Sequence, residues 1–320
     1  MVSHSGLVFN LANRPKTLTI ERQASPVQTL NNGDIMMSER SFNSNRIHKK
    51  TGFTLIELLV VISIIAILMG ILMPSLGMAR KMAQSITCSS HLRTLMIAWN
   101  LYAGDNDDKL VAAQTGMEGR PNWFSGGLSF TSAAVNWDIE NNMTTSPLWT
   151  YVGKNRKIYK CPADKAEVTN NLGTWVPRVR SNSMSQVFGY GEWLNSSPSN
   201  RSQTVWRTYS KLTGIVHPGK TWVFIDEHPN SINDAAFANA CTDASVPSAA
   251  RIIDFPANYH NGACGFSFAD GHALVRKWSG SKIKDAEVFF GIGGGIALNV
   301  PAEDSWEDVQ WMAENTTVRR

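Results

Sequence analysis

The sequence predicts an α+β protein in which one long N-terminal helix packs against an antiparallel β-sheet with long loops. Two adjoining segments predict the helix: a continuous apolar run over residues 53–73 and a stretch with helical periodicity over residues 74–103. Beyond about residue 104 the composition changes, since Gly, Asn, Ser, Pro and Trp become frequent and short strand-like runs alternate with turn signals. We therefore expect residues 104–320 to form the globular part.

Residues 53–73 have the length and composition of a membrane-spanning helix. Only three of these 21 residues have polar side chains, and Glu57 alone is charged. At about 1.5 Å per residue, a helix of this length spans roughly 30 Å, which matches the hydrocarbon core of a bilayer. Lys49 and Lys50 precede the run, which predicts that its N-terminal end stays in the cytoplasm and that the globular part lies outside it.

Glu57 stands out because a carboxylate inside an apolar helix is costly unless a cation neutralises it. The alternative is that Glu57 lies close enough to the membrane surface to reach water. The order of residues around it carries further information, because a basic stretch that ends in glycine leads directly into the apolar run: Lys49-Lys50-Thr51-Gly52, then Phe53-Thr54-Leu55-Ile56-Glu57.

This arrangement resembles the processing signal of the type IV prepilin family, which includes the pseudopilins of type II secretion. The resemblance implies a pilin-like fold and cleavage by a prepilin peptidase between Gly52 and Phe53, followed by N-methylation of Phe53. It also implies that Glu57 pairs with the new amino terminus of a neighbouring subunit during assembly. The alternative interpretation of the same segment is an uncleaved signal anchor.

Residues 1–52 form a basic leader in this interpretation. They contain seven Lys or Arg and three Asp or Glu side chains, a net charge of +4 that equals that of the whole chain. The remainder is therefore neutral, which argues against nucleic acid as a partner. Prepilin leaders are often shorter than this one, so Met36 or Met37 is an alternative start of translation.

Residues 74–103 predict an amphipathic second half of the same helix. Pro74 removes one backbone hydrogen bond and predicts a kink. We do not expect the helix to end there, because apolar residues from Leu76 to Tyr102 recur at steps of three and four. One face of this half should pack on the globular part.

The globular part contains six strand-like runs and a helix near its C-terminus. Ser305 is the expected N-cap of that helix, with Asp308 three residues later. The clearest pair of strands is a hairpin over residues 260–278, in which Asp270-Gly271 would form a two-residue turn. The runs are Lys157–Tyr159, Val187–Tyr190, Thr204–Tyr209, Thr221–Ile225, Gly265–Phe268 and Ala273–Trp278.

The hairpin also has a distinctive motif, because nine residues separate His260 from Asp270-Gly271. This resembles the H-X9-DG domain at the C-terminal end of many prepilin-type proteins, particularly in planctomycetes and their relatives. The segment Cys161-Pro162-Ala163-Asp164 resembles the Cys-Pro-x-Asp segment of that family. The resemblance identifies a domain without implying a biochemical role for it.

The four cysteines permit two disulfides if the globular part lies outside the cytoplasm. Of the three pairings, we favour Cys88 with Cys161, which would tie the helix to the globular part, and this leaves Cys241 with Cys264. The alternative is that one or both pairs stay reduced as small core residues. None of the four has the close paired spacing of a zinc site, so the spacing argues against zinc.

Several titratable residues could meet at one site. Asp226, Glu227 and Asp270 are candidate ligands for Ca²⁺, because carboxylate oxygens suit that ion. The alternative is that Asp270 serves its turn and His260 binds a backbone carbonyl. Since no nucleophile elbow, P-loop, His-Glu-x-x-His or dinucleotide motif is present, we do not expect an enzyme.

We therefore expect a structural subunit of the inner membrane, with a single span. It would be processed by prepilin peptidase and would assemble with other pilin or pseudopilin subunits, on a secretion or pilus assembly platform, into a pseudopilus or pilus-like fibre. The first alternative is a membrane-anchored binding module whose loops and tryptophans capture a polysaccharide or solute. The second is a membrane-tethered hydrolase that uses His260 and Asp270.

Overall fold

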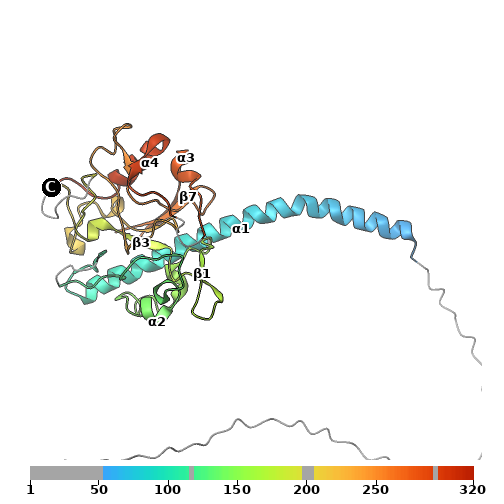
Figure 1. Cartoon of the computed structure of the whole chain (residues 1–320), viewed down its shortest axis with the longest axis horizontal. Helices are drawn as coiled ribbons and strands as arrows, with labels where there is room; N and C mark the ends of the chain where they lie inside the picture. The colour runs from blue at the N-terminus through green and yellow to red at the C-terminus, as the bar shows by residue number, and fades with distance from the viewer. Residues whose placement is uncertain (1–52, 115–118, 197–204, 291–294) are drawn as a thin grey trace, which may run out of the picture. The chain divides into compact units, whose positions relative to one another are not determined.

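The computed structural model describes residues 53–114, 119–196, 205–290 and 295–320 (Figure 1). The predicted leader, with its glycine at position 52 and the alternative starts at positions 36 and 37, lies outside the described residues.

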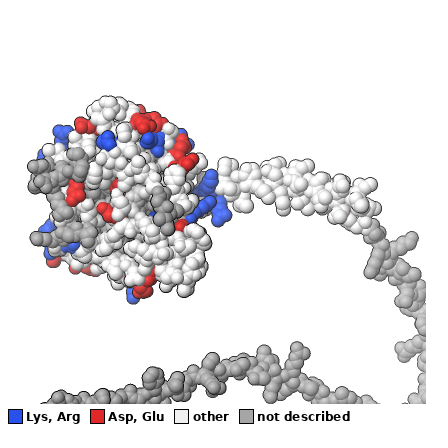
Figure 2. All heavy atoms as spheres, in the orientation of Figure 1, with Lys and Arg blue, Asp and Glu red and all other residues white. Residues whose placement is uncertain are grey.

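One helix, α1 (Leu55–Asp105), contains both predicted halves and continues through Pro74. Residues 53–83 are exposed, and in Figure 2 the visible face of the apolar stretch carries no charged side chain. The second half is amphipathic, because one of its faces enters the core of the globular part. The buried residues of α1 are Cys88, Leu92, Leu95, Met96, Ala98, Trp99, Tyr102 and Ala103.

The main sheet has five strands in the order β5-β3-β4-β7-β8. All neighbouring pairs are antiparallel except β3 and β5, which are parallel. The structure thus confirms the predicted α+β class, with this one parallel pair as an addition. The strands are β3 (Asn182–Ser185), β4 (Trp222–Asp226), β5 (Ala236–Phe237), β7 (Ala263–Phe268) and β8 (Ala273–Lys277).

The two faces of the sheet are covered by different helices, and Figure 1 shows α1 and α4 (Trp306–Glu314) on opposite sides of the strands. Phe224 of β4 belongs to the core that includes the second half of α1. Phe266 of β7 belongs to the second core, where its ring lies 5.1 Å from that of Trp311. Apolar side chains on both faces explain why nearly all residues of the central strands are buried.

Short elements complete the globular part. They include two further two-stranded ladders and two single-turn helices. These are β1 (Glu167–Thr169) with β2 (Trp175–Pro177), β6 (Arg251–Ile252) with β9 (Val300–Pro301), α2 (Ile139–Asn142) and α3 (Ser281–Lys284). The 3-10 turns are η1 (Ala134–Asn136), η2 (Arg156–Tyr159), η3 (Gln186–Phe188), η4 (Leu212–Gly214), η5 (Pro218–Lys220) and η6 (Glu303–Ser305).

Three predicted strands are wrong. Residues 157–159 lie in η2, because the Asn155 side chain accepts a hydrogen bond from the Lys157 amide, 3.1 Å away, and starts a turn. Residues 187–188 lie in η3, and the strand at this place, β3, comes just before them. In the predicted strand 204–209, Trp206 is the only described residue that forms β-pairing, through an isolated bridge to Arg319.

The hairpin of β7 and β8 is confirmed, but its turn is longer than predicted. The Phe268 amide donates to the His272 carbonyl (2.9 Å), and the Gly271 amide donates to the Phe268 carbonyl (2.8 Å). The connection therefore has three residues, 269–271. Gly271 adopts φ 96°, so glycine is needed at the end of this longer turn.

The C-terminal helix α4 is confirmed with Ser305 at its N-cap position, but the Ser305 side chain does not cap the helix. Ser305 makes no side-chain cap hydrogen bond, and its hydroxyl instead accepts from the Ile283 amide at 3.1 Å. Asp308 accepts hydrogen bonds from the Ser279 and Gly280 amides, at 3.0 and 2.9 Å. Both side chains thus fix the loop after β8 rather than the start of α4.

Candidate functional site

The start of α1 is closed by a reciprocal pair of hydrogen bonds. The Thr54 amide and hydroxyl donate to Glu57 Oε2 at 2.8 and 2.9 Å, and the Glu57 amide donates to Thr54 Oγ1 at 3.2 Å. This is a capping box, which satisfies backbone amides that the helix leaves without partners. In the single chain, the Glu57 carboxylate therefore has a local role, because it caps the start of α1 through Thr54, the residue after Phe53.

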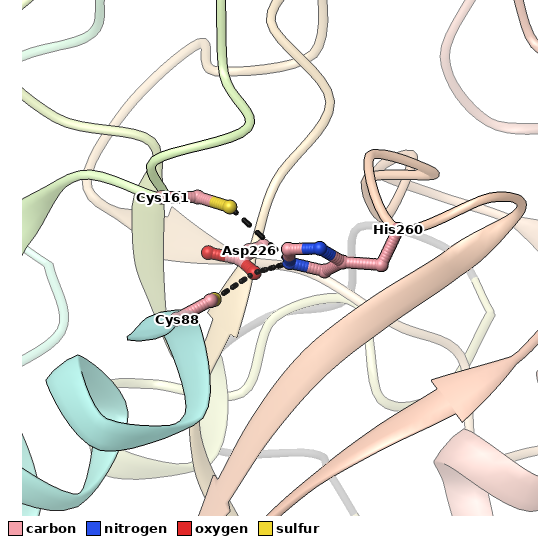
Figure 3. Close-up of side chains that lie close together, drawn as sticks. All are labelled: Cys88, Cys161, Asp226 and His260. Atoms are coloured by element: carbon pink, nitrogen blue, oxygen red, sulfur yellow. Dashed lines mark hydrogen bonds and ion pairs between the residues drawn. The ribbon is translucent and has the colours of Figure 1, made fainter. Parts of the chain in front are cut away.

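A second group of side chains lies between the helix and the sheet. Cys88, Cys161, Asp226 and His260 point toward one another (Figure 3), and their donor atoms all lie within 4.8 Å of one another. Cys88 Sγ lies 2.9 Å from Asp226 Oδ2, and Cys161 Sγ lies 3.3 Å from His260 Nε2. His260 Nε2 is 3.8 Å from the same Asp226 oxygen. We call these four residues the Cys-Cys-Asp-His cluster.

Each member of the cluster comes from a different part of the fold. Cys88 lies at the start of the buried face of α1, and Asp226 is the last residue of β4. Cys161 follows η2, where its amide donates to Ser181 Oγ at 2.8 Å. His260 precedes β7, and its amide donates to the Ala263 carbonyl at 3.3 Å. Helix α1, strand β4 and these two amide hydrogen bonds therefore fix the four members of the cluster.

Gly265 of β7 makes room for the cluster. A Cβ atom at this position would lie 2.8 Å from Asp226 Oδ2, 3.1 Å from Cys88 Sγ and 2.7 Å from Leu92 Cδ1. Real Cβ contacts essentially never fall below 3.0 Å, so only glycine lets α1 approach the sheet this closely here.

Burial and mutual contacts shift the protonation of the cluster. The pKa of Cys88 rises well above its ordinary value, because its thiol is hydrogen-bonded to Cys161 and lies in a buried place near Asp226. Burial raises the pKa of Cys161, but hydrogen bonds from Cys88 and His260 outweigh it and leave that pKa lowered. Burial lowers the pKa of His260, and contacts with Asp226 and Cys161 outweigh it and raise it to about 10. The cluster therefore favours a Cys161 thiolate beside a protonated imidazole.

The three carboxylates expected to hold Ca²⁺ do not come together. Glu227 is buried and accepts hydrogen bonds from the Ser183 and Ser231 hydroxyls, while Asp226 faces Cys88. Asp270 stays in its turn, where it accepts from the His272 amide at 3.1 Å and pairs with the His272 ring at 2.6 Å. Among the described residues, the Cys-Cys-Asp-His cluster is the group with metal-ligand spacing, so the expected calcium set is corrected.

All four cysteines are free thiols in the structure. Cys88 and Cys161 are brought together, as the favoured pairing requires, but they share their site with Asp226 and His260. Cys241 Sγ lies 3.9 Å from the Ala313 carbonyl, and Cys264 Sγ lies 3.1 Å from the Asp226 carbonyl. The side chain of His260, expected to bind a backbone carbonyl, instead contacts Cys161 and Asp226.

A buried carboxyl group outside the cluster, that of Asp254, predicts how the stability of the fold changes with pH. Burial raises the pKa of Asp254 to about 8, although its carboxylate accepts a hydrogen bond from the Ala238 amide at 2.6 Å. The folded chain then holds a proton that the unfolded chain releases above about pH 4. The folded state binds more protons between about pH 4 and pH 8, so this group's contribution to stability falls as pH rises through that window.

We expect Asp254→Asn to flatten the pH dependence of unfolding between pH 6 and pH 8. One proton changes the free energy of unfolding by at most about 1.4 kcal/mol per pH unit. Urea unfolding of the detergent-solubilised chain, followed by tryptophan fluorescence at several pH values, measures this slope. Glu307→Gln, at an exposed position of α4, is the matched control. An unchanged slope in Asp254→Asn would show that Asp254 does not carry the proton.

Comparison with known proteins bears on the N-terminal segment. Residues 47–73 match the family described as the prokaryotic N-terminal methylation motif. This segment is therefore similar to a prokaryotic N-terminal methylation motif. The match includes the start of α1 and its capping box, while the resemblance of residues 260–271 to an H-X9-DG domain stays a prediction.

A relative with a known role is similar over a limited stretch. The type IV wide pilus major component PilA4 of Thermus thermophilus is 46% identical over 56 residues, which are 18% of this chain. The chain spans 43% of the length of that relative. No solved structure matches the chain. The comparisons therefore support a pilin-like protein with a membrane-length helix, and they do not extend to the chemistry of the globular part.

Proposed function

We propose that this protein is a structural pilin or pseudopilin-like subunit that is stored in the inner membrane and assembles into a pseudopilus or pilus-like fibre. One observation carries the proposal: the methylation motif at residues 47–73 includes the start of an apolar helix that is long enough to cross a membrane and whose apolar part is not buried in the chain. Prepilin peptidase would cleave between Gly52 and Phe53, and Phe53 would then be methylated.

The exposed half of α1 requires a partner. Large apolar side chains in residues 53–73 are 45–79% exposed in the single chain, and water would not tolerate a surface of this size. Lipid covers it before assembly, and helices of neighbouring subunits cover it in a fibre. Subunits along a fibre are related by a screw rotation, so their contacts are heterologous, and each Glu57 can meet the amino terminus of a different subunit.

The charges around the helix support one orientation in the membrane. Lys49 and Lys50 precede the apolar run and hold that end in the cytoplasm. The globular part would then lie on the extracytoplasmic side, with a single span. Residues 58–79 contain no charged side chain, so no position after Glu57 opposes insertion.

We expect Gly52→Ala to block processing. The measurement is intact mass and N-terminal sequencing of the protein from native membranes, or from a host that supplies a prepilin peptidase. The wild-type chain should begin at methylated Phe53, and the variant should keep residues before it. Gly70→Ala is the control, because a Cβ there meets nothing within 4 Å and should leave processing unchanged.

A wild-type chain that keeps residues before Phe53 would contradict the proposal. The helix would then serve as an anchor only, and a binding module on a membrane stalk would take its place. Among the described residues of the globular part, that alternative has three exposed aromatic side chains to offer: Trp175 of β2 (65% exposed), Phe289 (48%) and Phe290 (61%). Trp123 is buried, and its Nε1 donates to the Ala235 carbonyl at 2.8 Å.

A further inference from the structure

We propose that the Cys-Cys-Asp-His cluster binds one Zn²⁺ ion, which joins α1 to the sheet of the globular part. The ligands would be Cys88 Sγ, Cys161 Sγ, His260 Nε2 and Asp226 Oδ2. This role is separate from fibre assembly, because it concerns the inside of one subunit.

The donor set suits a tetrahedral zinc ion. Zinc–sulfur bonds of about 2.3 Å and zinc–nitrogen or zinc–oxygen bonds of about 2.0–2.1 Å place the ligand atoms of a tetrahedron roughly 3.3–3.8 Å apart. The three distances between donor atoms given above are 2.9, 3.3 and 3.8 Å, and all the donor atoms lie within 4.8 Å of one another. Small rotations of four side chains would bring them to these values.

The direction of the His260 ring favours a metal over a catalytic relay. In a nucleophile–histidine–carboxylate triad, the nucleophile and the carboxylate contact opposite nitrogens of the ring. Here one nitrogen, Nε2, faces both Cys161 and Asp226. A bound ion requires donor atoms that converge on one point, as these do. A proton relay would instead need the two ring nitrogens to contact different groups.

The Asp226 carboxylate is only partly satisfied by the protein. Its side chain is fully buried, and one of its carboxylate oxygens, Oδ1, has no hydrogen-bond partner. Among the described residues, its only ion-pair partner within 4.0 Å is His260. A buried carboxylate beside two cysteine side chains is costly, whereas a divalent ion would compensate the carboxylate and two thiolates together.

The ligand types select the metal. Two thiolates and an imidazole prefer zinc or another borderline-soft ion, and Ca²⁺ would require oxygen ligands throughout. The site has four protein ligands and is closed, which is the form of structural zinc sites. A pocket of about 630 Å³ next to the cluster, lined by Cys161, His91 and Thr87 among others, gives an ion a route to it.

A disulfide between Cys88 and Cys161 is the competing state of the same atoms. It would leave the Asp226 carboxylate and the His260 imidazole without their sulfur partners. The zinc proposal accounts for all four side chains, and a disulfide accounts for two. The two states exclude each other, because zinc needs both thiolates.

The test measures zinc in the purified full-length chain in detergent, by elemental analysis after dialysis against metal-free buffer. Wild type should hold about one zinc per chain, and Cys161→Ser should lower zinc affinity at least about 100-fold. Cys241→Ser is the matched control, because Cys241 is buried outside the cluster and its variant should keep one zinc. Full zinc retention in Cys161→Ser would overturn the proposal.

A second measurement does not depend on how any variant folds. Wild-type chain freed of metal by a chelator under reducing conditions is titrated with Co²⁺, which should give the intense visible bands of a tetrahedral cobalt thiolate. Addition of Zn²⁺ should remove them. The absence of such bands, or a Cys88–Cys161 linked peptide in mass spectra of the chain as isolated, would overturn the proposal in favour of the disulfide.

Discussion

Replacing Glu57 with glutamine is expected to abolish entry of the subunit into fibres while the start of α1 stays intact. Glutamine at this position still accepts hydrogen bonds from Thr54, so the capping box survives. What is lost is the negative charge that would neutralise the amino terminus of Phe53 in a neighbour. Removing one partner of a buried ion pair costs about 3–5 kcal/mol, and every subunit contact in the fibre would bear that cost.

The measurement compares the subunit in sheared fibre and membrane fractions from cells with the native assembly machinery. Thr54→Ala is the matched control, since it removes the hydroxyl of the capping box and keeps the charge, at a cost of about 1 kcal/mol. It should still enter fibres. Equal fibre yields from Glu57→Gln and wild type would show that Glu57 acts as a helix cap and that its charge is not needed for assembly.

The second large effect is expected at Gly265, where the helix and the sheet are in closest contact. An added Cβ would lie 2.7 Å from Leu92 Cδ1 and 2.8 Å from Asp226 Oδ2, and in tight contact with Cys88 Sγ at 3.1 Å, so these buried side chains or α1 itself would have to shift. Overpacking of this kind costs about 1–3 kcal/mol for alanine, and valine should cost more. We expect Gly265→Ala to lower the free energy of unfolding by this amount, and Gly265→Val to prevent stable folding.

Urea unfolding of the detergent-solubilised chain measures this change. Gly104→Ala is the control, because this glycine is exposed near the end of α1 and a Cβ there meets nothing within 4 Å. Its substitution should leave stability unchanged or raise it by up to about 1 kcal/mol, since alanine favours helix. A Gly265→Ala variant as stable as wild type would mean that α1 does not lie against β7 as described.

The helix could be predicted from the sequence because its signals are local. The apolar run predicts the membrane-length half, and apolar residues spaced by three and four predict the half that packs on the globular part. The helix continues through Pro74, as these signals predict. The hairpin of β7 and β8 was equally clear from alternation and its Asp-Gly turn. The length of the turn could not be predicted, because it depends on the register between the two strands.

Strand β3 could not be predicted, because its sequence Asn-Ser-Met-Ser is polar although all four residues are buried. It becomes a strand through its position between β4 and β5, and its polar side chains find buried partners such as Glu227. Tertiary surroundings thus override local preference.

The Cys-Cys-Asp-His cluster shows the same limit for a functional site. Each of its four residues stands out in the sequence, but the sequence argues against zinc because no two of them are closely spaced in the chain. Ligands from a helix, a loop, a strand end and the segment before a hairpin leave no spacing to recognise. The one usable signal is that Cys161 and His260 each lie in a motif-like segment.

The burial of one face of α1 also affects the order in which parts of the protein can fold during synthesis. The apolar anchor leaves the ribosome early and can enter the membrane at once. The face with Leu92 and Trp99 must then wait for β4 and β7, which are translated much later. In the proposed membrane-anchored subunit, the globular part would therefore fold on a chain that is already tethered. The membrane would then hold the unfinished subunit in place during the stage when exposed apolar surface would otherwise lead to aggregation.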